Sequence, residues 1–277
     1  MFVDSDFFVR FWGVRGSIPC PGPDTAIYGG NTPCVEIRCG SRVLIFDAGT
    51  GIRRLANTLS ADNVRNVDLF LTHTHLDHIN GFPMFNFLFD DQHHLKIWAG
   101  KREGWSPIKD VFEKFMAPPV WPLSIEDLGA KTIFIDFEIG QVITLTPGII
   151  IRTVNLNHPQ GAVGYRVEFS GKSICYVTDT EHFKGRRDPN ILKLIERADI
   201  VIYDASFTDD EYPNYVGWGH STWQEGVRLC AAASARRLVV FHHLPGRSDS
   251  ELAVIDSSVG SLLPGSVVAR EDMVLTP

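Results

Sequence analysis

The chain has 277 residues and an ordinary globular composition, in which 44% of residues are hydrophobic, 21% charged and 11% aromatic. Its formal charge of −7 disfavours binding to duplex DNA, which proteins hold mainly by neutralising phosphates. No apolar run reaches the ~20 residues of a membrane span, and the acidic N-terminus, MFVDSDFFVRFWG, is unlike a signal peptide. Five cysteines at irregular spacing indicate reduced thiols. We therefore expect a cytoplasmic protein with no membrane and no duplex DNA partner.

Strand-like segments dominate the chain on both sides of a looser insert. The first are FFVRFWGV, CVEIRC, RVLIFDAG and VDLFLT. The insert, residues 82–130, is rich in Phe, Trp and Pro, and one helix is expected near 108–116. The second run is KTIFIDFE, QVITL, IIIRTVNL, AVGYRVEF, KSICYVTD and ADIVIYDAS. A helix over 222–235, with Ser221 or Thr222 as its N-cap, precedes a last buried strand, RRLVVFHH.

The order of these segments predicts the architecture. Two β-rich halves, about 1–140 and 141–277, indicate two sheets packed together with helices outside. No long polar linker separates the halves, so we expect one domain over 1–277.

Metal-ligand residue types gather where the strand VDLFLT ends, in LTHTHLDHING. His73 and His75 are two residues apart, so in extended backbone their side chains point the same way. Asp77 and His78 follow as the chain turns into an expected helix. An isolated histidine pair is usually surface decoration, but this pattern directly after an apolar strand predicts a metal site.

Three more ligand-type residues follow other strands. They are His158 after IIIRTVNLN, Asp179 after KSICYVT and His242 after RRLVVF. Alone, each could be a turn or capping residue. Together the seven residues give five histidines and two aspartates, which suits two metal ions that share a bridging carboxylate. Ligand softness favours two Zn²⁺ ions, and Mn²⁺ could serve as well.

The motif HTHLDH, followed by lone His158, Asp179 and His242, resembles the metallo-β-lactamase superfamily over nearly the whole chain. The resemblance implies an α/β fold, a four-layer αββα sandwich of two mixed β-sheets with a dinuclear site at one sheet edge. It implies that one metal is held by His73, His75 and His158. The other would be held by Asp77, His78 and His242, with Asp179 bridging the two. His243 is the rival of His242, which we favour because it comes first after the strand.

A second constellation, Asp204 in ADIVIYDASF and His220 in GWGHSTW, narrows the expected chemistry. It resembles the phosphodiesterase branch, which includes tRNA 3′-processing nucleases and cyclic-phosphate phosphodiesterases. There a carboxylate orients the histidine of a GHST motif, although Glu is commoner than Asp in its place. The competing interpretation makes His220 the residue before a helix that starts at Ser221, and Asp204 a solvated strand end. We expect His220, Asp204 and Asp77 to be catalytic.

Phosphodiester hydrolysis explains why these groups would be paired. Two metals about 3.5–4 Å apart would supply the attacking hydroxide and bind the phosphate oxygens. His220, held by Asp204, would donate a proton or stabilise developing charge. In the N-terminal stretch, Ser17, Asn31 and Thr32 would face the substrate. Arg15 would either touch phosphate or be structural, and it is left out of the site.

The expected substrate is small. The tRNA-processing enzymes carry a protruding basic arm before the lone histidine, whereas segment 140–158 offers two compact strands and a Pro147-Gly148 turn. With the negative charge, this favours a small cyclic nucleotide or cyclic phosphate. The alternatives are a tRNA 3′-processing endonuclease, a thioester or lactone hydrolase of the same fold, and a metal-bound sensor without turnover.

Two aromatic segments have open roles. Segment 207–219 would be a lid whose Tyr212, Tyr215 or Trp218 stacks on a base, or a loop packed on its own domain. Segment 82–89 would line the pocket or form a homodimer contact. The remaining histidines are assigned no role: His93, His94 and His182.

Overall fold

Two β-sheets form the centre of the protein. The computed structural model describes residues 7–146 and 148–277, and its strands form two seven-stranded sheets. The first contains, in spatial order, β14 (Val274–Leu275), β1 (Phe7–Gly13), β2 (Cys34–Cys39), β3 (Arg42–Phe46), β4 (Asn66–Leu71), β5 (His94–Gly100) and β6 (Lys131–Phe137). The second contains β13 (Val267–Val268), β12 (Leu238–Phe241), β11 (Ile200–Asp204), β10 (Lys172–Val177), β9 (Ala162–Phe169), β8 (Ile149–Leu156) and β7 (Val142–Thr146). Pro147, expected in a turn, lies outside the described residues.

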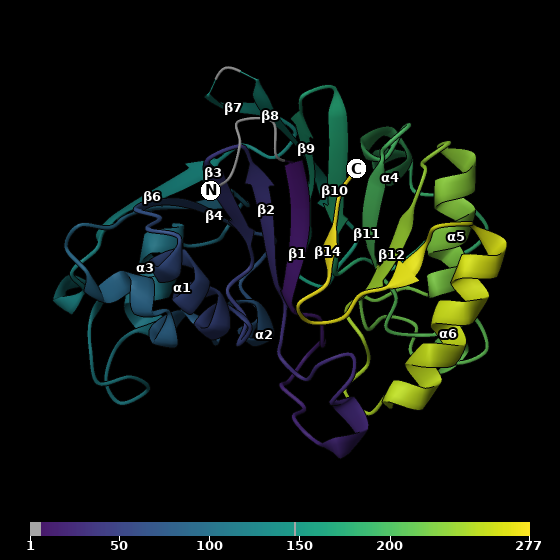
Figure 1. The fold of residues 1–277 in the computed structure, drawn as a ribbon, viewed down its shortest axis with the longest axis horizontal. Helices are drawn as coiled ribbons and strands as arrows, with labels where there is room; N and C mark the ends of the chain where they lie inside the picture. Colours follow the sequence, from purple (N-terminus) through teal and green to yellow (C-terminus); the bar gives the residue numbers. More distant parts are fainter. Residues whose placement is uncertain (1–6, 147) are drawn as a thin grey trace.

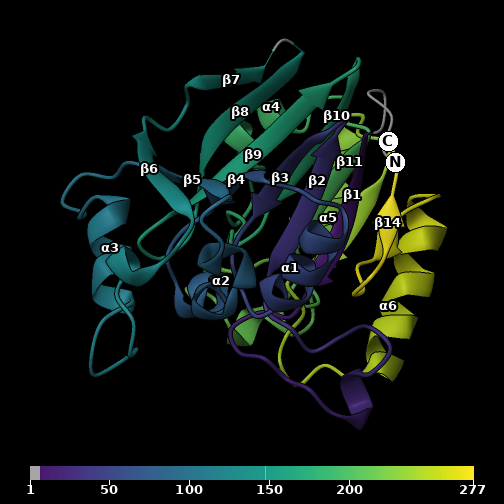
Figure 2. The same ribbon diagram turned by 60° about the vertical axis from the view of Figure 1, so that its left-hand side comes forward.

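Both sheets are mixed and lie between helices. Strands β3 to β6 pair in parallel and β1 to β3 antiparallel, while β10 to β13 pair in parallel and β7 to β10 antiparallel. Figure 1 shows α1 (Ile52–Ala61) and α3 (Ile108–Phe115) outside the first sheet, and α5 (Trp223–Ala232) and α6 (Asp249–Leu262) outside the second. The turned view in Figure 2 agrees. The expected αββα sandwich is confirmed.

The shorter helical segments and one helix cap complete the description. Besides α2 (Leu76–Ile79) and α4 (Pro189–Leu194), the chain forms 3-10 turns at Pro23–Thr25, Phe82–Met84, Asn86–Phe89, Ile125–Asp127 and Tyr212–Asn214. The helix expected near 108–116 is α3. Helix α5 begins at Trp223, because the Thr222 side chain accepts a hydrogen bond from the Glu225 backbone N–H at 3.1 Å. Thr222, not Ser221, is therefore the N-cap.

Aromatic side chains join the two sheets. The Phe46 ring of β3 is fully buried and stacks on Phe70 of β4, with centroids 5.4 Å apart. It also meets two rings of the second sheet edge-on, Tyr165 at 5.3 Å and Tyr176 at 5.8 Å. Burying each large ring contributes roughly 1.5–3 kcal/mol. This cluster fixes the two sheets against each other.

The insert over 82–130 contains more structure than the sequence indicated. Strand β5 lies within it and pairs with β4 and β6. Most of the aromatic side chains of segment 82–89 are buried. Phe82, Phe85 and Phe87 lie in the core beneath the helices, away from the site. Phe82 packs against Phe112 of α3 at 4.4 Å between ring centroids. The segment does not line the site, because most of its aromatic residues fill the layer between α1, α3 and the first sheet. A homodimer contact through this segment stays a prediction.

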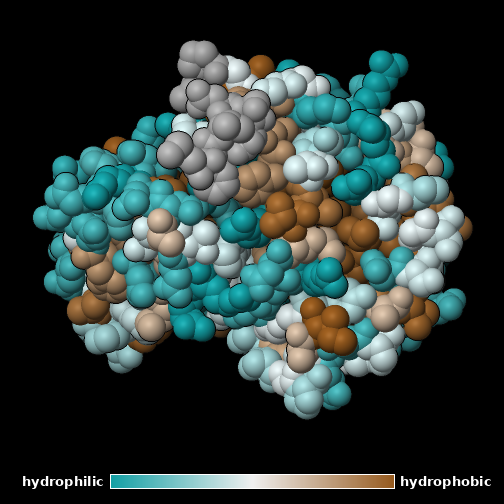
Figure 3. All heavy atoms as spheres, in the orientation of Figure 1, coloured by the Kyte–Doolittle hydropathy of each residue, from teal (hydrophilic) through white to brown (hydrophobic). Residues whose placement is uncertain are grey.

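The surface carries scattered apolar side chains. In Figure 3 they gather near the edge strand β14, whereas the side of α1 and α3 is mostly hydrophilic. Val274 of β14 is one of them, 45% exposed. Among residues 7–146 and 148–277, no helix is long and apolar enough to cross a bilayer. The five cysteines are free, as expected.

Candidate metal centre and active site

The sandwich brings the predicted ligands to one place because parallel strands end at a common edge. Strands β3, β4, β10, β11 and β12 all end there, and α2 follows β4 at the lower end of the sheets in Figure 1. Candidate ligand atoms form compact triads, each within 4.8 Å. One triad is His73, His75 and His158. Another is Asp77, His78 and His242.

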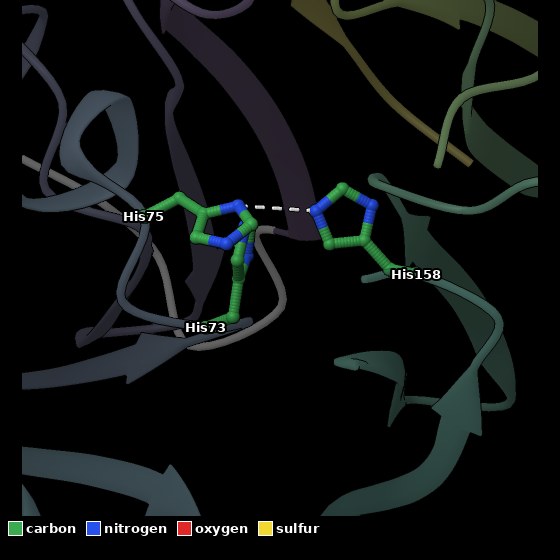
Figure 4. Close-up of side chains that lie close together, drawn as sticks. All are labelled: His73, His75 and His158. Carbon is green, nitrogen blue, oxygen red and sulfur yellow. Dashed lines mark hydrogen bonds between the residues drawn. The ribbon is translucent and has the colours of Figure 1, made fainter. Parts of the chain in front are cut away.

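Figure 4 shows how the first triad is assembled. His73 and His75 come from the loop after β4, and His158 faces them from the loop after β8. The His158 Nε2 lies 3.1 Å from the His75 Nδ1. Residues more than eighty positions apart in the chain therefore converge on one point.

Asp179 lies between the two triads. Its Oδ1 is 3.8 Å from the His73 Nε2 and 3.7 Å from the His158 Nε2. Its Oδ2 is 3.2 Å from the His78 Nε2 and 3.4 Å from the His242 Nε2. One carboxylate thus presents a separate oxygen to each triad, which is the arrangement a bridging ligand needs.

Unsatisfied ring nitrogens test whether the residues fit metal ions. The Nε2 atom of His73 is buried and has no hydrogen-bond partner, and that of His78 faces carboxylate oxygens of Asp179 and Asp77 at 3.2 and 3.3 Å. A buried polar atom without a partner is costly and needs an explanation. Metal ligation would supply one, because a neutral imidazole offers a lone pair at that nitrogen. The described residues therefore fit a metal centre.

The opposite ring nitrogens are held in place, which orients the lone pairs. The His78 Nδ1 is 2.8 Å from Asp47 Oδ2, and the His158 Nδ1 is 2.8 Å from the Gly219 carbonyl oxygen. In both His78 and His158, Nδ1–H donates to the acceptor named, so the Nε2 of each ring faces the cluster. The His75 ring is reversed, since its Nε2 lies 2.7 Å from Gln160 Oε1 and its Nδ1 faces inward. Such outer contacts fix tautomer and ring orientation at metal sites.

Asp47 was missed by the sequence analysis. It is fully buried directly after β3 and accepts hydrogen bonds from the Thr72 hydroxyl at 3.0 Å and the Tyr176 hydroxyl at 3.0 Å, besides His78. Its signal was present in RVLIFDAG, where an acid ends an apolar strand. Asp47 holds the His78 ring without belonging to a triad.

Backbone strain marks the same edge. Asp47, Asp179 and His242 adopt positive φ angles of 61°, 59° and 60°. Non-glycine residues rarely occupy this region, and those that do concentrate at functional sites. Each residue follows a strand end closely, so the chain turns sharply and directs a polar side chain at the cluster.

The electrostatics of the cluster favour a cation. Burial lowers the pKa of His73 well below its usual value, which keeps the ring neutral. For His78, burial opposes the charged form, but Asp179, Asp77 and Asp47 outweigh it and raise the pKa well above the usual value. The carboxylates that attract a proton to His78 would equally attract a metal cation.

Asp204 and His220 form the predicted pair. The His220 Nδ1 lies 2.8 Å from the Asp204 Oδ2, and Asp204 is fully buried. Burial alone would lower the pKa of His220, but the Asp204 carboxylate outweighs it and raises the pKa to about 9. The His220 ring stacks on His242 at 4.9 Å, next to the second triad. Asp204 is therefore no solvated strand end.

Other predicted positions have structural partners. His243 points away, with its Nε2 2.8 Å from the Ala269 carbonyl oxygen. Arg15 is fully buried and donates to backbone carbonyls, including that of Arg247 at 2.7 Å. Asn31 donates to Glu271 at 3.0 Å. His243, Arg15 and Asn31 therefore have structural roles. The expectation that Asn31 faces the substrate was wrong, because its side chain is bound to Glu271.

The other two residues of that stretch also bind within the protein. Thr32 is fully buried against Asn80, so it does not face the substrate as expected. The Ser17 backbone N–H donates to Asp77 Oδ2 at 2.8 Å, which places Ser17 beside the second triad. Among the histidines without an assigned role, His182 lies with its Nδ1 2.9 Å from the Ser221 hydroxyl.

Loop 207–219 packs mainly on its own domain. Tyr215 stacks on Phe207, with centroids 4.2 Å apart, and the Tyr212 hydroxyl donates to Glu181 Oε1 at 2.9 Å. Glu181 also accepts from the Gly219 backbone N–H at 2.8 Å, directly before His220. Trp218 alone among the three aromatic candidates is well exposed, at 62%.

Comparison with known proteins agrees with this geometry. A family model described as Beta-lactamase superfamily domain matches residues 42–243, most of the chain. The chain belongs to the β-lactamase superfamily. Its two mixed sheets with outer helices are the metallo-β-lactamase fold, and the expectation of a hydrolase is confirmed.

Individual relatives cover almost the full length. Ribonuclease Z of Pyrococcus furiosus is 25% identical, over 95% of this chain and 94% of that protein. The metallo-β-lactamase fold protein YhfI of Bacillus subtilis has a TM-score of 0.72 and 20% identity, covering 97% of this chain and 98% of that one. A diphosphatase of the PhnP family has a TM-score of 0.69 and 17% identity, covering 98% of both chains.

Proposed function

We propose that this hydrolase is a dinuclear metal-dependent phosphodiesterase that acts on a small cyclic nucleotide or related cyclic phosphate. The observation that carries the proposal is the Asp204–His220 pair, 2.8 Å apart and beside two ligand triads. Ester, thioester or lactone hydrolysis would not need this pair. A sensor without turnover would need neither the pair nor an activated water.

The triads and Asp179 would hold the metals. His73, His75 and His158 would bind one ion, and Asp77, His78 and His242 the other, with Asp179 shared. Bound metal ions would neutralise the phosphate oxygens and activate the attacking water. Five imidazoles with two carboxylates suit Zn²⁺, and the carboxylates also make Mn²⁺ acceptable.

The chain itself would supply the proton. Because Asp204 holds the Nδ1–H of His220, a protonated ring has its Nε2–H free to donate to the leaving alkoxide. The raised pKa of His220 keeps that proton available near neutral pH. The Asp77 Oδ2 accepts a hydrogen bond from the Ser17 backbone N–H, which fixes the orientation of this carboxylate within the second triad.

The size of the substrate separates the two leading candidates. The formal charge of −7 and the short β7–β8 hairpin, where a tRNA-binding arm would stand, favour a small phosphodiester. The relationship to Ribonuclease Z supports the alternative, a tRNA 3′-processing endonuclease. We retain the small phosphodiester because nothing in the 140–158 segment, Pro147 apart, extends from the sheet.

A substrate panel tests the proposal. Zn- and Mn-loaded protein of measured metal content would be assayed with 3′,5′- and 2′,3′-cyclic nucleotides, a precursor tRNA, a thioester and a lactone. We expect metal-dependent hydrolysis of a cyclic phosphate and none of the tRNA. Cleavage of the tRNA at physiological salt would establish the alternative, and turnover of only the thioester or lactone would exclude both phosphodiesterase candidates.

A further inference from the structure

A cavity of about 230 Å³ lies beside the histidine cluster, between the ends of β4 and β5 and the start of α3. His73 and Thr74 form its wall on the side of the cluster. Leu71, Ala99 and Ile108 make much of the remaining wall apolar. A substrate bound at the cluster therefore has a second compartment next to it.

An unpaired positive charge lines this cavity. The Arg102 Nη2 is buried without a hydrogen-bond partner, and no described carboxylate forms an ion pair with the guanidinium. One carboxylate, that of Asp136, also lines the cavity, and its Oδ1 accepts a hydrogen bond from the Ile108 backbone N–H at 3.1 Å. The guanidinium carbon lies 5.8 Å from the centre of the Trp105 ring. Leaving a buried donor unsatisfied is costly. Because Arg102 lines the cavity and its guanidinium forms no described hydrogen bond or ion pair, the group can donate charge-assisted hydrogen bonds to an anion bound there.

The position of Arg102 is tied to the metal centre. A Cβ added at Gly161 would collide with the guanidinium, so the side chain packs directly on the Gly161 backbone. The Gly161 N–H donates to the His158 carbonyl oxygen at 2.7 Å, and the neighbouring Gln160 contacts His75. One short turn therefore positions the first triad and supports Arg102.

We propose that Arg102 binds a second phosphate group of the substrate while the scissile phosphodiester lies at the histidine cluster. The inference rests on the proposed function and narrows its substrate class. A guanidinium binds phosphate through paired parallel hydrogen bonds. The apolar wall and Trp105 would contact the organic part between the two phosphates. The preferred substrate is thus a phosphodiester with a further phosphate, not a singly charged cyclic nucleotide.

Calorimetric binding measures the contribution of Arg102 without turnover. Metal-loaded protein would be titrated with thymidine 5′-monophosphate and thymidine 3′,5′-bisphosphate, which differ by one phosphate. We expect the wild type to bind the bisphosphate about tenfold more tightly, and Arg102→Gln to lose this preference. Lys109→Gln is the matched control and should keep it, because Lys109 is exposed on α3, pairs with Glu113 at 3.2 Å and does not line the cavity.

A further ligand tests whether the second phosphate can belong to an oligonucleotide, and a further variant controls for misfolding. The dinucleotide pTpT carries an internucleotide phosphodiester at the position of the 3′-phosphate of the bisphosphate. If a phosphate of an oligonucleotide can occupy the cavity, Arg102→Gln should weaken the affinity for pTpT as it weakens that for the bisphosphate. Arg102→Lys keeps the charge without the paired donors and should retain part of the preference.

Two results would overturn the inference. They are equal affinity of the wild type for both ligands, and an unchanged preference in Arg102→Gln. Turnover of bis(p-nitrophenyl) phosphate by the wild type is measured in parallel. Its absence would contradict the proposed function, while the binding preference would still report on Arg102.

Discussion

His78 shows how one residue is prepared for metal binding. Its Nδ1 is held by Asp47 at 2.8 Å, and its Nε2 lies 3.3 Å from Asp77 Oδ2 and 3.2 Å from Asp179 Oδ2. The Asp47 carboxylate is itself fixed by the Thr72 and Tyr176 hydroxyls. The orientation of a cluster residue thus depends on a carboxylate outside both triads.

Replacing Asp47 should weaken metal binding selectively. Asp47→Asn removes the charge that supports His78, and loss of such a contact typically lowers metal affinity about 10–100-fold. Competition with a chelator would measure the dissociation constants. The control is Asp68→Asn, which removes another buried carboxylate, one bound by Arg42 and Trp98 in the same sheet. Equal metal affinity in wild type and Asp47→Asn would show that Asp47 does not support the site.

At the scale of elements, strand ends and one loop build the site. Loop 207–219 ends at Gly219, whose carbonyl oxygen accepts from the His158 ring and whose N–H donates to Glu181. Gly219 has a φ of +85°, and an added Cβ would collide with Pro159 and His158. Gly217 has a φ of +90°, with open space around it.

Gly219→Ala should therefore impair the site more than Gly217→Ala. Both substitutions carry the backbone cost of a left-handed residue, about 1–2 kcal/mol, but only the first forces His158 to move. We expect a loss of turnover of at least tenfold for Gly219→Ala relative to Gly217→Ala, with similar thermal unfolding midpoints. Similar turnover of the two variants would show that the packing of Gly219 on His158 is unimportant.

The sequence predicted elements best where apolar runs end in polar residues. Each strand that precedes a predicted ligand was expected. The buried residues of β4, β10 and β12 form continuous runs, whereas β8, which precedes His158, is only partly buried but is rich in β-branched residues. Strand β5 was missed because exposed His94 and Lys96 alternate with buried residues in HLKIWAG, within a segment of turns and aromatics. The contacts of Gln160 and Arg102 could not be predicted from the sequence. Gln160 contacts the distant His75, and Arg102 packs on the backbone of the distant Gly161, which has no side chain to signal the contact.

For the whole molecule, the contact between the sheets determines whether the site exists at all. The first sheet supplies His73 and Asp77, and the second supplies His158 and Asp179. The Phe46 ring touches Tyr165 and Tyr176 across the interface. Loss of this packing should separate ligands that come from different halves.

Phe46→Ala should destabilise both sheets together. Truncating a fully buried Phe typically costs about 3–5 kcal/mol, whereas Phe89→Ala, at a side chain 47% exposed, should cost under about 0.5 kcal/mol. Urea unfolding followed by circular dichroism would measure both. A single transition that shifts as a whole agrees with the predicted single domain over 1–277. Two transitions, only one of them shifted, would contradict it.

The central claim, a metal-dependent phosphodiesterase assisted by His220, is tested most directly by one paired measurement. Turnover of bis(p-nitrophenyl) phosphate and bound metal are determined on the same samples of wild type and His220→Ala. We expect equal metal content and a fall in turnover of roughly 10²–10⁴-fold in the variant, the usual range for a general acid or base. Near-wild-type turnover by metal-loaded His220→Ala would contradict the claim.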